Sequence, residues 1–586
     1  MVIKLSLGLL LWISFLFISE KQLGVSALTN RIPSWRTKSG PLTRATTTQL
    51  YQTSVPSSSR SSSSSSSSST TTSSRQKRVS SLEEWAKKSA DIQIANGNLA
   101  IQASLTSEDA GLGLVSKQRI EAGSVVVTVP ASLALSVELP RGGPDDLSVV
   151  KMLVDDRTLF RSLPWYTQFA FYLYKLDKIS SMKQTGNNLI DMRPWLDSLP
   201  RKFTTPIHWT EEQRKDLLQY SHMDESVQRQ EISWKEIYKT LGECSNVEAT
   251  GMSWEDFLWG CETARSRAFS GGYTGAPFNP FIYAFTLVLV TAYIGLNLGT
   301  LEQAANGAAL VFCGSILRDF VFPKLFRNKK YVICPVIDMC NHNSLATTAN
   351  VAYEFFANAY SLSTISPVPS NSELFISYGS RSNDQLLQYY GFVERDNPHD
   401  IYVMPPLREW DIAALEKACG APFAPGRLQK LDRAGLLGKS KDDALSAAMS
   451  SSKNSNDDDS TSEDGTSEGN PRGGVVLSRT VGIDPAVIQA LRALVSTDEE
   501  WKDAGESIGN FGAEVNPDNE RKARLAARTA IEMELASKPT TLAEDREMLK
   551  RLASSKSGLQ GEDERIGLLF RIEKKKLLKE TIDRLQ

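Results

Sequence analysis

Cysteine and histidine are scarce in this sequence, and their scarcity excludes several kinds of site. The 586 residues include six cysteines and four histidines, and no two cysteines stand in a C-x-x-C pair. Zinc sites and disulfide frameworks usually show such spacings. We therefore expect no metal, no disulfide framework and mostly buried, reduced thiols. The cysteines are Cys244, Cys261, Cys313, Cys334, Cys340 and Cys419.

Acidic residues are almost absent from the first 80 residues. That part carries ten Lys or Arg and one acid, a balance of +9, whereas the rest carries 56 basic (66 − 10) and 67 acidic (68 − 1) residues, a balance of −11. An acidic body argues against a nucleic-acid-binding face, which needs clustered Lys and Arg. We therefore expect no nucleic-acid partner.

The same N-terminal part has the composition of a targeting sequence. Lys4 precedes the apolar run Leu5–Ile18, and the small residues of Val25–Ala27 follow, which is the layout of a signal peptide. Residues 28–80 are rich in Ser and Arg, as organelle transit peptides are. A signal peptide over 1–27 before a transit peptide resembles the presequence of algae with secondary plastids. This predicts a plastid protein, stromal or membrane-associated; the alternative is a secreted protein with a disordered Ser-rich stalk.

Charged residues are missing from Ala268–Leu301. Within it, Pro280–Gly299 is almost wholly apolar, and a second uncharged stretch, Gln303–Leu317, follows. Crossing a bilayer takes about 20 apolar residues. Two alternatives stay open for 280–317, namely a transmembrane hairpin that makes a membrane contact and a pair of buried helices.

Four segments carry the motifs that point to chemistry. The segment "VICPVIDMCNHNS", Val332–Ser344, predicts a strand with a polar tip. The segment "ELFISYGSRSNDQLLQYYGFV", Glu373–Val393, predicts a strand, a polar turn and a helix. Upstream lie a glycine turn followed by β-branched strands in Ala110–Pro130 and the sequence "RSRAF" at Arg265–Phe269. In this order, the segments resemble the SET-domain methyltransferases, and "RSRAF" resembles their Rubisco large-subunit lysine methyltransferase branch.

The resemblance implies an α+β fold, in which a SET β-fold with a helical insert precedes an all-α substrate-binding domain. The SET domain would span 81–395, with its helical insert at about 150–270 and an extra apolar insertion at about 271–330. The substrate-binding domain would span 396–586, with a disordered acidic loop at 450–474. We expect folded sequence to begin with a helix capped by Ser80 or Ser81.

The resemblance also implies a cofactor, S-adenosyl-L-methionine, and a role for each site residue. Methyl transfer needs a neutral amine held in line with the breaking bond, so positioning and desolvation supply most of the help. Tyr378 would be the catalytic residue that orients the amine. Asp338 would mainly fix the Asn-His loop. The expected cofactor-binding residues are Gly111, Leu112, Gly113, Arg267, Asp338, Asn341 and His342, and the expected lysine channel is Phe269, Tyr353 and Tyr390.

These expectations favour a monomeric protein-lysine N-methyltransferase that acts on an abundant plastid protein, such as Rubisco large subunit or aldolase. We expect the methyl-transfer machinery to be complete before Arg395 and the later helices to recognise the protein substrate. A protein-histidine methyltransferase of the same fold is one alternative. A non-catalytic, membrane-tethered scaffold is another, which the intact Asn341, His342 and Tyr378 disfavour.

Overall fold

The computed structural model describes a large part of the chain. Its described residues are 68–94, 99–105, 111–138, 160, 163–185, 188–244, 251–271, 280–296, 300–316, 330–354, 357–439, 473–554 and 560–586. The predicted signal peptide (1–27), the predicted transit peptide as far as residue 67 and the predicted acidic loop up to residue 472 lie outside them. The chain divides into two units, Ser73–Phe278 with Pro323–Gln586, and Met1–Thr72 with Asn279–Phe322.

The first described helix begins earlier than the sequence predicted. Helix α2 (Ser68–Lys88) runs through Ser80 and Ser81, so neither serine caps its start. Leu82, Trp85 and Ala86 are buried, and the Trp85 indole donates to the Asp191 carbonyl oxygen at 2.6 Å. Packing of this later part of α2 stabilises the helix, and the polar turns before it extend it without a cap at the predicted position.

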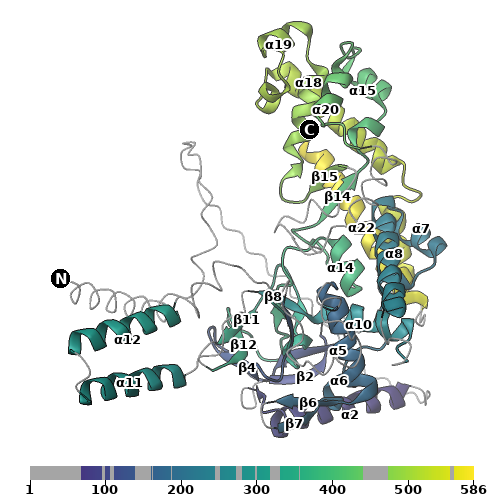
Figure 1. The fold of residues 1–586 in the computed structure, drawn as a ribbon. Coiled ribbons are helices and arrows are strands. Elements are labelled where there is room, and N and C mark those ends of the chain that lie inside the picture. Colours follow the sequence, from purple (N-terminus) through teal and green to yellow (C-terminus); the bar gives the residue numbers. More distant parts are fainter. Residues whose placement is uncertain are drawn as a thin grey trace. The chain divides into compact units, whose positions relative to one another are not determined.

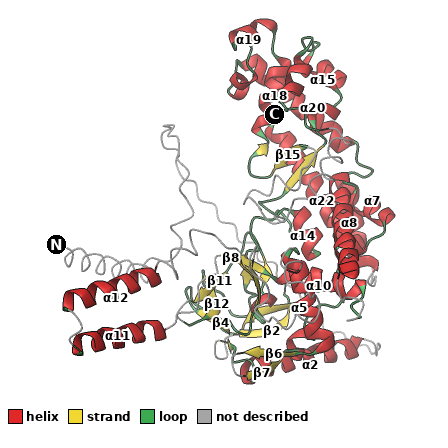
Figure 2. Ribbon diagram, in the orientation of Figure 1, coloured by secondary structure: helices red, strands yellow, loops and turns green. Residues whose placement is uncertain are grey.

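Short strands form the first part of the large unit (Figures 1 and 2). The main sheet has the order β1-β4-β12-β11, and its three strand pairs are antiparallel. Its strands are β1 (Gln93–Ile94), β4 (Val125–Pro130), β12 (Ala359–Thr364) and β11 (Ala349–Glu354). Smaller sheets pair β2 (Leu99–Ala103) with β3 (Leu112–Ser116), and β6 (Met182–Thr185) with β7 (Asn188–Asp191). Two further strands, β10 (Asn341–His342) and β13 (Phe375–Ile376), pair in parallel and bring two of the sequence motifs together.

The predicted helical insert is present between these strands. Its elements are α5 (Trp165–Tyr174), η2 (Lys175–Ile179), α6 (Arg193–Leu196), η3 (Pro206–His208), α7 (Glu211–Leu218), α8 (Ser221–Cys244) and α10 (Trp254–Arg267). All ten residues of α5 are buried. Helix α10 packs so closely on α5 that a Cβ at Gly260 would lie 2.7 Å from the Ala170 Cα. This packing fixes the end of α10, from which "RSRAF" extends.

The predicted apolar insertion begins and ends at facing residues of a β-hairpin. Strand β8 (Phe269–Gly271) pairs antiparallel with β9 (Lys330–Ile333), and Gly271 faces Lys330 in register. Strand β9 also pairs with β5 (Leu135–Glu138), so the small sheet has the order β5-β9-β8. The insertion is therefore the connection of a hairpin, and the strands that precede and follow it pair with each other. Within it lie two helices that contact each other, α11 (Pro280–Gly295) and α12 (Leu301–Ile316).

The structure bears on the transmembrane alternative for 280–317. Among the described residues, no helix combines the length and apolar character that a membrane crossing requires. The 16 residues of α11 would extend about 24 Å, against about 30 Å of hydrocarbon. The transmembrane hairpin is therefore not supported. Considered within their own unit, the two helices leave the side chains of Phe285, Leu287 and Val288 exposed.

Helices dominate the C-terminal part, as predicted, but it is not all-α. Strands β14 (Ile401–Met404), β15 (Val475–Ser478) and β16 (Gly482–Ile483) form an antiparallel sheet that helical periodicity did not reveal. Its longer helices are α18 (Pro485–Val495), α20 (Pro517–Ala536), α21 (Leu542–Ser554) and α22 (Gln560–Arg584). The shorter elements are η6 (Leu407–Glu409), α15 (Ile412–Cys419), α16 (Arg427–Arg433), α19 (Asp498–Asp503) and η7 (Ile508–Gly512).

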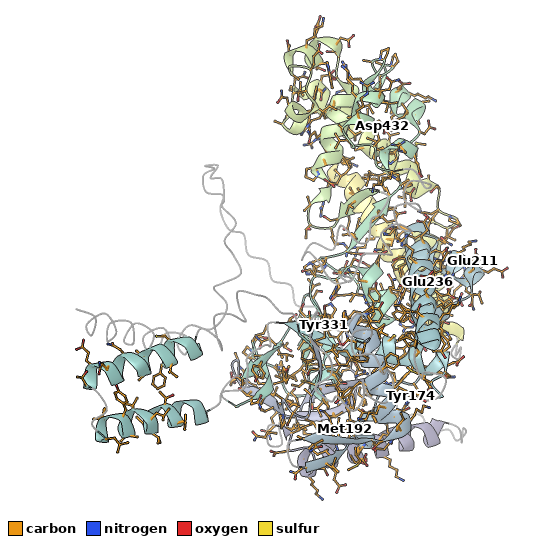
Figure 3. The ribbon with its side chains drawn as sticks, viewed as in Figure 1. Tyr174, Met192, Glu211, Glu236, Tyr331 and Asp432 are labelled. Carbon is orange, nitrogen blue, oxygen red and sulfur yellow. The ribbon has the colours of Figure 1, made fainter. Side chains whose placement is uncertain are left out.

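Two hydrophobic cores fill the large unit, and their border does not lie at residue 395. The first core gathers buried side chains from the strands, α5 and α10, including Met192 and Tyr331, which are labelled in Figure 3. The second core gathers the C-terminal elements together with part of the helical insert. The insert residues in it are Trp209, Leu218, Tyr220, Met223 and Val227. The predicted division at 395/396 therefore cuts through the second core.

Candidate functional site

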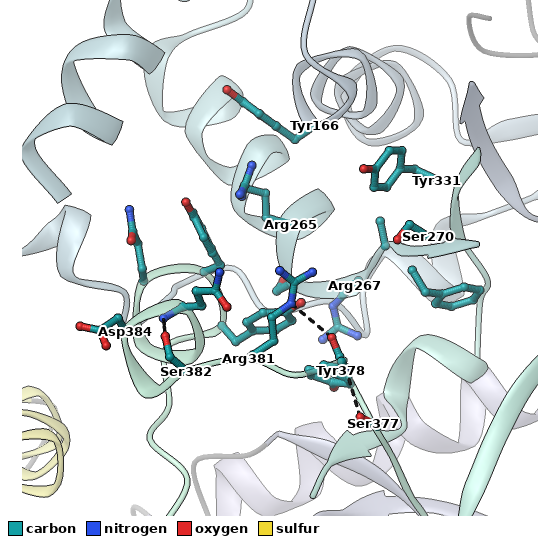
Figure 4. A pocket seen from close by; sticks show the side chains of 18 of the residues that line it. Tyr166, Arg265, Arg267, Ser270, Tyr331, Ser377, Tyr378, Arg381, Ser382 and Asp384 are labelled. Atoms are coloured by element: carbon teal, nitrogen blue, oxygen red, sulfur yellow. Dashed lines mark hydrogen bonds between the residues drawn. The ribbon is translucent and has the colours of Figure 1, made fainter. Parts of the chain in front are cut away.

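A cavity of about 740 Å³ lies between the helical insert and the motif segments. Its walls come from α8, the end of α10, strands β8 and β11, the turn before α14 (Asn383–Tyr390) and α14 itself. Figure 4 shows side chains from these elements converging on it. Five predicted site residues line the cavity, namely Arg267, Phe269, Asp338, Tyr378 and Tyr390. The other six, Gly111, Leu112, Gly113, Asn341, His342 and Tyr353, do not line it.

Asp338 and Arg267 form a buried ion pair in the cavity wall. One Arg267 nitrogen, Nη1, donates to Oδ2 and to the backbone oxygen of Asp338, both at 3.1 Å. The Trp195 indole donates to the same Oδ2 at 3.2 Å. Burial raises the pKa of Asp338, and Arg267 opposes that rise. The Arg267 Nε is a buried donor for which the described residues supply no acceptor.

The motif predicted a strand that leads directly to Asp338, but the structure has no such strand. Strand β9 stops at Ile333, and Asp338 lies in η5 (Ile337–Met339), a short 3-10 helix. The turn between them contains Val336 at φ +74°, a conformation that a β-branched residue rarely adopts. Val336 is fully buried, so the surrounding core holds this turn and aims Asp338 back at Arg267.

Asn341 is held by a residue that the sequence analysis did not single out, Glu373. The Asn341 amide donates to Glu373 Oε1 at 2.6 Å and to the Leu112 carbonyl oxygen at 3.3 Å. Glu373 is 5% exposed and also accepts from the Ser104 hydroxyl and from the backbone N–H of Leu105. An acid at the start of an apolar strand was the available signal, since a buried carboxylate needs donors from elsewhere in the fold.

The two glycines of the predicted turn meet different requirements, a steric one at Gly113 and a conformational one at Gly111. A Cβ at Gly113 would lie 2.3 Å from Glu373 Oε1 and 3.2 Å from the Asn341 amide nitrogen, so the Asn341–Glu373 pair needs this position empty. Gly111 has φ +71°, and a Cβ there would meet nothing within 4 Å. Gly111 therefore has a backbone conformation that favours glycine, and there is open space beside it.

Tyr378 lies in a stack of aromatic rings. Its ring is stacked on His342 at 5.0 Å and on Tyr390 at 4.9 Å. Its hydroxyl donates to the Cys340 carbonyl oxygen at 2.9 Å. Burial raises the pKa of Tyr378 well above its usual value, and the neighbouring Tyr390 adds to the rise. The phenol therefore stays protonated near neutral pH.

His342 positions Tyr378. The Tyr378 backbone N–H donates to His342 Nδ1 at 3.0 Å. The same Nδ1 atom lies 3.3 Å from the Ile376 carbonyl oxygen. On the shorter contact with the Tyr378 N–H, we assign the imidazole proton to Nε2, which lies 3.1 Å from the Ser344 hydroxyl and 3.5 Å from Glu394 Oε2. Burial raises the pKa of Glu394, but its bonds to His342 and Ser344 outweigh that effect and lower it. The His342 side chain is 0% exposed, so only the backbone of this residue is left for a ligand.

Phe269 and Tyr353 are linked through Tyr360. Phe269 meets the Tyr360 ring edge-on at 6.5 Å, and Tyr353 meets the same ring at 5.3 Å. The Tyr353 hydroxyl donates to Asn358 at 2.8 Å. Tyr353 therefore lies behind the cavity wall rather than in it.

Helix α14, which carries Tyr390, is held from the C-terminal part. Lys574 of α22 donates to Asp384 at the start of α14, to Asp400 at 2.8 Å and to the Ile401 carbonyl oxygen at 2.6 Å. Lys574 is 3% exposed. Burial lowers its pKa, but Asp384 and Asp400 outweigh that and keep it charged. No sequence motif marks Lys574.

The cysteines and metal candidates add no further site. Cys261, Cys334 and Cys340 are free and buried, and burial raises the pKa of each thiol. Cys313 and Cys419 are free and half-buried. Within the described ranges, no group of three or more His, Cys, Asp or Glu residues could hold a metal ion.

Comparisons with known proteins show what this chain is similar to. Residues 421–578 match the family model for Rubisco LSMT substrate-binding. The chain is 23% identical over 335 residues to a chloroplastic ribulose-1,5-bisphosphate carboxylase/oxygenase large subunit N-methyltransferase of Pisum sativum, covering 56% of this chain and 53% of that protein. It is 24% identical over 299 residues to human N-lysine methyltransferase SETD6, covering 50% of each. These alignments span about half the length of either relative.

Other similarities point the same way. The chain is 21% identical over 342 residues to a chloroplastic [fructose-bisphosphate aldolase]-lysine N-methyltransferase of Arabidopsis thaliana, covering 56% of this chain and 54% of that protein. A crystal structure of the SET domain of LSMT bound to methyllysine and AdoHcy matches with a TM-score of 0.51 at 17% identity, over 87% of this chain and 91% of that one. The predicted SET fold is therefore confirmed.

Proposed function

We propose that this SET-domain protein of the Rubisco large-subunit methyltransferase branch is an S-adenosyl-L-methionine-dependent protein-lysine N-methyltransferase. The observation that carries the proposal is Tyr378. Tyr378 lines the cavity and keeps its proton; its hydroxyl is fixed by the Cys340 carbonyl oxygen, and its ring is fixed by the rings on both sides. A phenol held in this way suits the orientation of a reacting group.

The residues present fit the proposed cofactor. The buried Nε of Arg267 is a donor that would suit the cofactor's carboxylate. The open space at Gly111 allows the backbone to approach a ligand closely. Asn341 and His342 commit their side chains to Glu373 and Tyr378, so their backbone groups would meet the cofactor. When bound, the cofactor supplies an electrophilic methyl group on a sulfonium.

The cavity wall would prepare the amine. A lysine has an ordinary pKa of about 10.4, and a dry, aromatic site favours its neutral form. Phe269, Tyr378 and Tyr390 supply aromatic walls of the cavity. Because Tyr378 keeps its own proton, it would not act as a base but would accept a hydrogen bond and hold the amine in line. The aromatic faces also tolerate the cationic methylated product.

The substrate we propose is an abundant plastid protein, with Rubisco large subunit and aldolase as first candidates. The names of the pea and Arabidopsis relatives support this choice, and both of those relatives are chloroplastic. The C-terminal match to the substrate-binding family model supports recognition of a folded protein. We propose that the chain acts in the plastid as a monomer.

The direct test is incubation of the full chain with methyl-labelled S-adenosyl-L-methionine and a plastid extract, followed by mass spectrometry of the labelled protein. We expect label on a lysine of a plastid protein. Label on a histidine would replace the proposal with a histidine methyltransferase. No label and no cofactor binding by calorimetry would leave the scaffold alternative.

The cofactor site has its own test, Asn341→Ala. Removing the amide leaves the buried Glu373 carboxylate without one donor and disturbs the strand next to Gly113. We expect the affinity for S-adenosyl-L-methionine to fall by about tenfold, because the backbone at 341 that would meet the cofactor loses an anchoring bond worth about 1.5–3 kcal/mol. Calorimetry measures it, with Asn510→Ala as the control outside the site. Unchanged affinity would remove Asn341 from the cofactor site.

A further inference from the structure

We propose that two stacked rings, Trp165 and Tyr331, form a subsite of the cavity that binds a neutral amide of the substrate protein. The amide would be the side chain of an Asn or Gln residue that enters the cavity together with the target lysine. This inference rests on the proposed function and adds the substrate chemistry of the same cavity. It concerns two polar atoms that none of the predicted site residues explains.

The two rings are buried and yet line the cavity. Trp165 at the start of α5 is 6% exposed, Tyr331 in β9 is 3% exposed, and both belong to the cavity wall. Their rings lie parallel, with the ring centres 4.1 Å apart. Phe169 on the same helix meets the Trp165 ring edge-on at 6.2 Å. Packing thus holds the pair in place in advance, which reduces the entropy lost when a ligand binds.

Each ring carries a buried polar atom without a partner. The described residues supply no acceptor for Trp165 Nε1 and no partner for the Tyr331 hydroxyl. In the described part of the chain, no other tyrosine hydroxyl is buried in this way. Trp209 and Trp501 also have an unpartnered indole nitrogen, but they belong to the second core and do not line the cavity. Because an unmade bond costs the desolvation of the polar atom, a buried Tyr or Trp usually has a partner.

The strands on either side of the apolar insertion place Tyr331 in the wall. Tyr331 in β9 faces Ser270 of β8 in register, and both residues line the cavity. Figure 4 shows the two side chains on one wall, with Tyr331 pointing inward. The same cavity of about 740 Å³ is lined by Tyr378. A volume of this size takes a ligand larger than one side chain, so residues beside the target lysine can enter with it.

The chemistry of the two atoms favours a neutral amide. An indole nitrogen can only donate, whereas a phenol hydroxyl can donate and accept. The oxygen of a side-chain amide can accept from Trp165, and its NH2 group can donate to Tyr331. One Asn or Gln side chain therefore suits both atoms. A carboxylate could only accept, and it would lose its hydration beside two neutral rings.

The test uses the full chain and matched sets of short lysine peptides. Each set has Gln at one position that flanks the lysine. One twin has Met there, which has a similar length and no amide, and the other twin has Glu, which is charged. We expect the Gln peptide of one set to bind about tenfold more tightly than its Met twin, because the Met twin lacks both hydrogen bonds. Fluorescence anisotropy without cofactor measures the binding.

Variants assign the preference to the two rings. Tyr331→Phe removes the hydroxyl and keeps the ring. We expect it to remove most of the preference for Gln, while the free energy of unfolding stays the same or rises, because an unpaired buried hydroxyl is lost. Trp165→Phe, which has no ring nitrogen, should also weaken the preference. The matched control is Tyr238→Phe, whose hydroxyl donates to the Met252 carbonyl oxygen outside the cavity; it should lower stability and keep the preference.

Each outcome decides one proposal. Equal binding of the Gln and Met peptides at every flanking position would overturn this inference and leave the methyltransferase intact. A preference that persists in Tyr331→Phe, or a Glu twin that binds more tightly than the Gln peptide, would also overturn it. If the chain methylates no protein in a plastid extract and binds no cofactor, the proposed function itself fails. A Gln preference that Tyr331→Phe removes would in that case still support the amide subsite.

Discussion

The two cores of the large unit hold their polar groups in different ways. In the strand-built core, buried carboxylates bind donors from other segments around the site, as in the Asn341–Glu373 contact and the Arg267–Asp338 ion pair. In the helix-built core, one helix, α22, carries buried charges that bind acids of neighbouring elements. Lys574 and Lys575 of α22 are both about 3% exposed and bind Asp400 and Asp545. The first arrangement sets the geometry of the site, and the second sets the stability of the elements around it.

Helix α14 shows how the two arrangements depend on each other. Its last residue, Tyr390, stacks on Tyr378 in the strand-built part, and its Asp384 binds Lys574 of α22. Its C-terminal Gly391 lies so close to Thr204 that a Cβ would be 2.8 Å from the hydroxyl oxygen. One wall of the cavity is therefore supported by a contact from residue 574, and the expectation that the machinery is complete before Arg395 stays a prediction.

The largest effect should follow from the loss of the Lys574 ion pairs that hold α14. Lys574→Met would leave Asp384 and Asp400 buried close to each other without their cation. Loss of one partner from a buried ion pair costs about 3–5 kcal/mol. We expect the free energy of unfolding, measured with denaturant, to fall by that amount. The control is Lys579→Met on an exposed position of the same helix. Equal stability of the two variants would show that the helix-built core does not hold α14.

Tyr378→Phe should separate geometry from stability. The variant loses the bond to the Cys340 carbonyl oxygen but keeps the ring stack. We expect turnover to fall about 100-fold with cofactor affinity nearly unchanged, because misplacement at the reacting centre acts on the rate. Single-turnover kinetics and calorimetry measure the two quantities. Wild-type turnover would make Tyr378 a structural residue only.

Gly113→Ala should damage the strand-built side alone. The added methyl group would overlap Glu373 Oε1, and overpacking typically costs about 1–3 kcal/mol. We expect that loss in thermal or chemical unfolding, together with weaker cofactor binding. Gly242→Ala in α8 is the matched control, since a Cβ there meets nothing within 4 Å and alanine favours a helix by about 0.5–1 kcal/mol. We therefore expect Gly113→Ala to lower the free energy of unfolding and Gly242→Ala to raise it.

The smallest effect should be a pH dependence of the free energy of unfolding that comes from the helical insert. His208 binds Glu262 at 2.9 Å, and this bond raises the pKa of His208. A raised pKa means that the pair stabilises the fold below the ordinary value of about 6.5 and that this is lost as pH rises through the folded pKa. Since His208 is 38% exposed, we expect less than about 1 kcal/mol. Unfolding of His208→Gln at pH 5.5 and 8.5 checks it, with His399→Gln as control. A larger loss at pH 8.5 would contradict the assignment.

The sequence predicted the SET fold but not the conformation of each motif. The order of the glycine turn, "RSRAF", the Asn-His motif and Tyr378 predicted the SET fold, and the charge-free stretch located an insertion that joins Gly271 and Lys330. The strand expected to reach Asp338 stops at Ile333 instead. Val336 is an apolar residue in an apolar run, so nothing in the pattern marked its positive φ.

The sequence by itself determined which residues could do chemistry, because residue types and spacings are local. The tertiary structure decided which partners those residues have. Asn341 binds Glu373 from 32 positions away, Asp338 binds Trp195 from 143, and Asp384 binds Lys574 from 190. A buried polar group must find its partner wherever the folded chain brings one. The contacts that fix the geometry of this site are therefore absent from any local pattern.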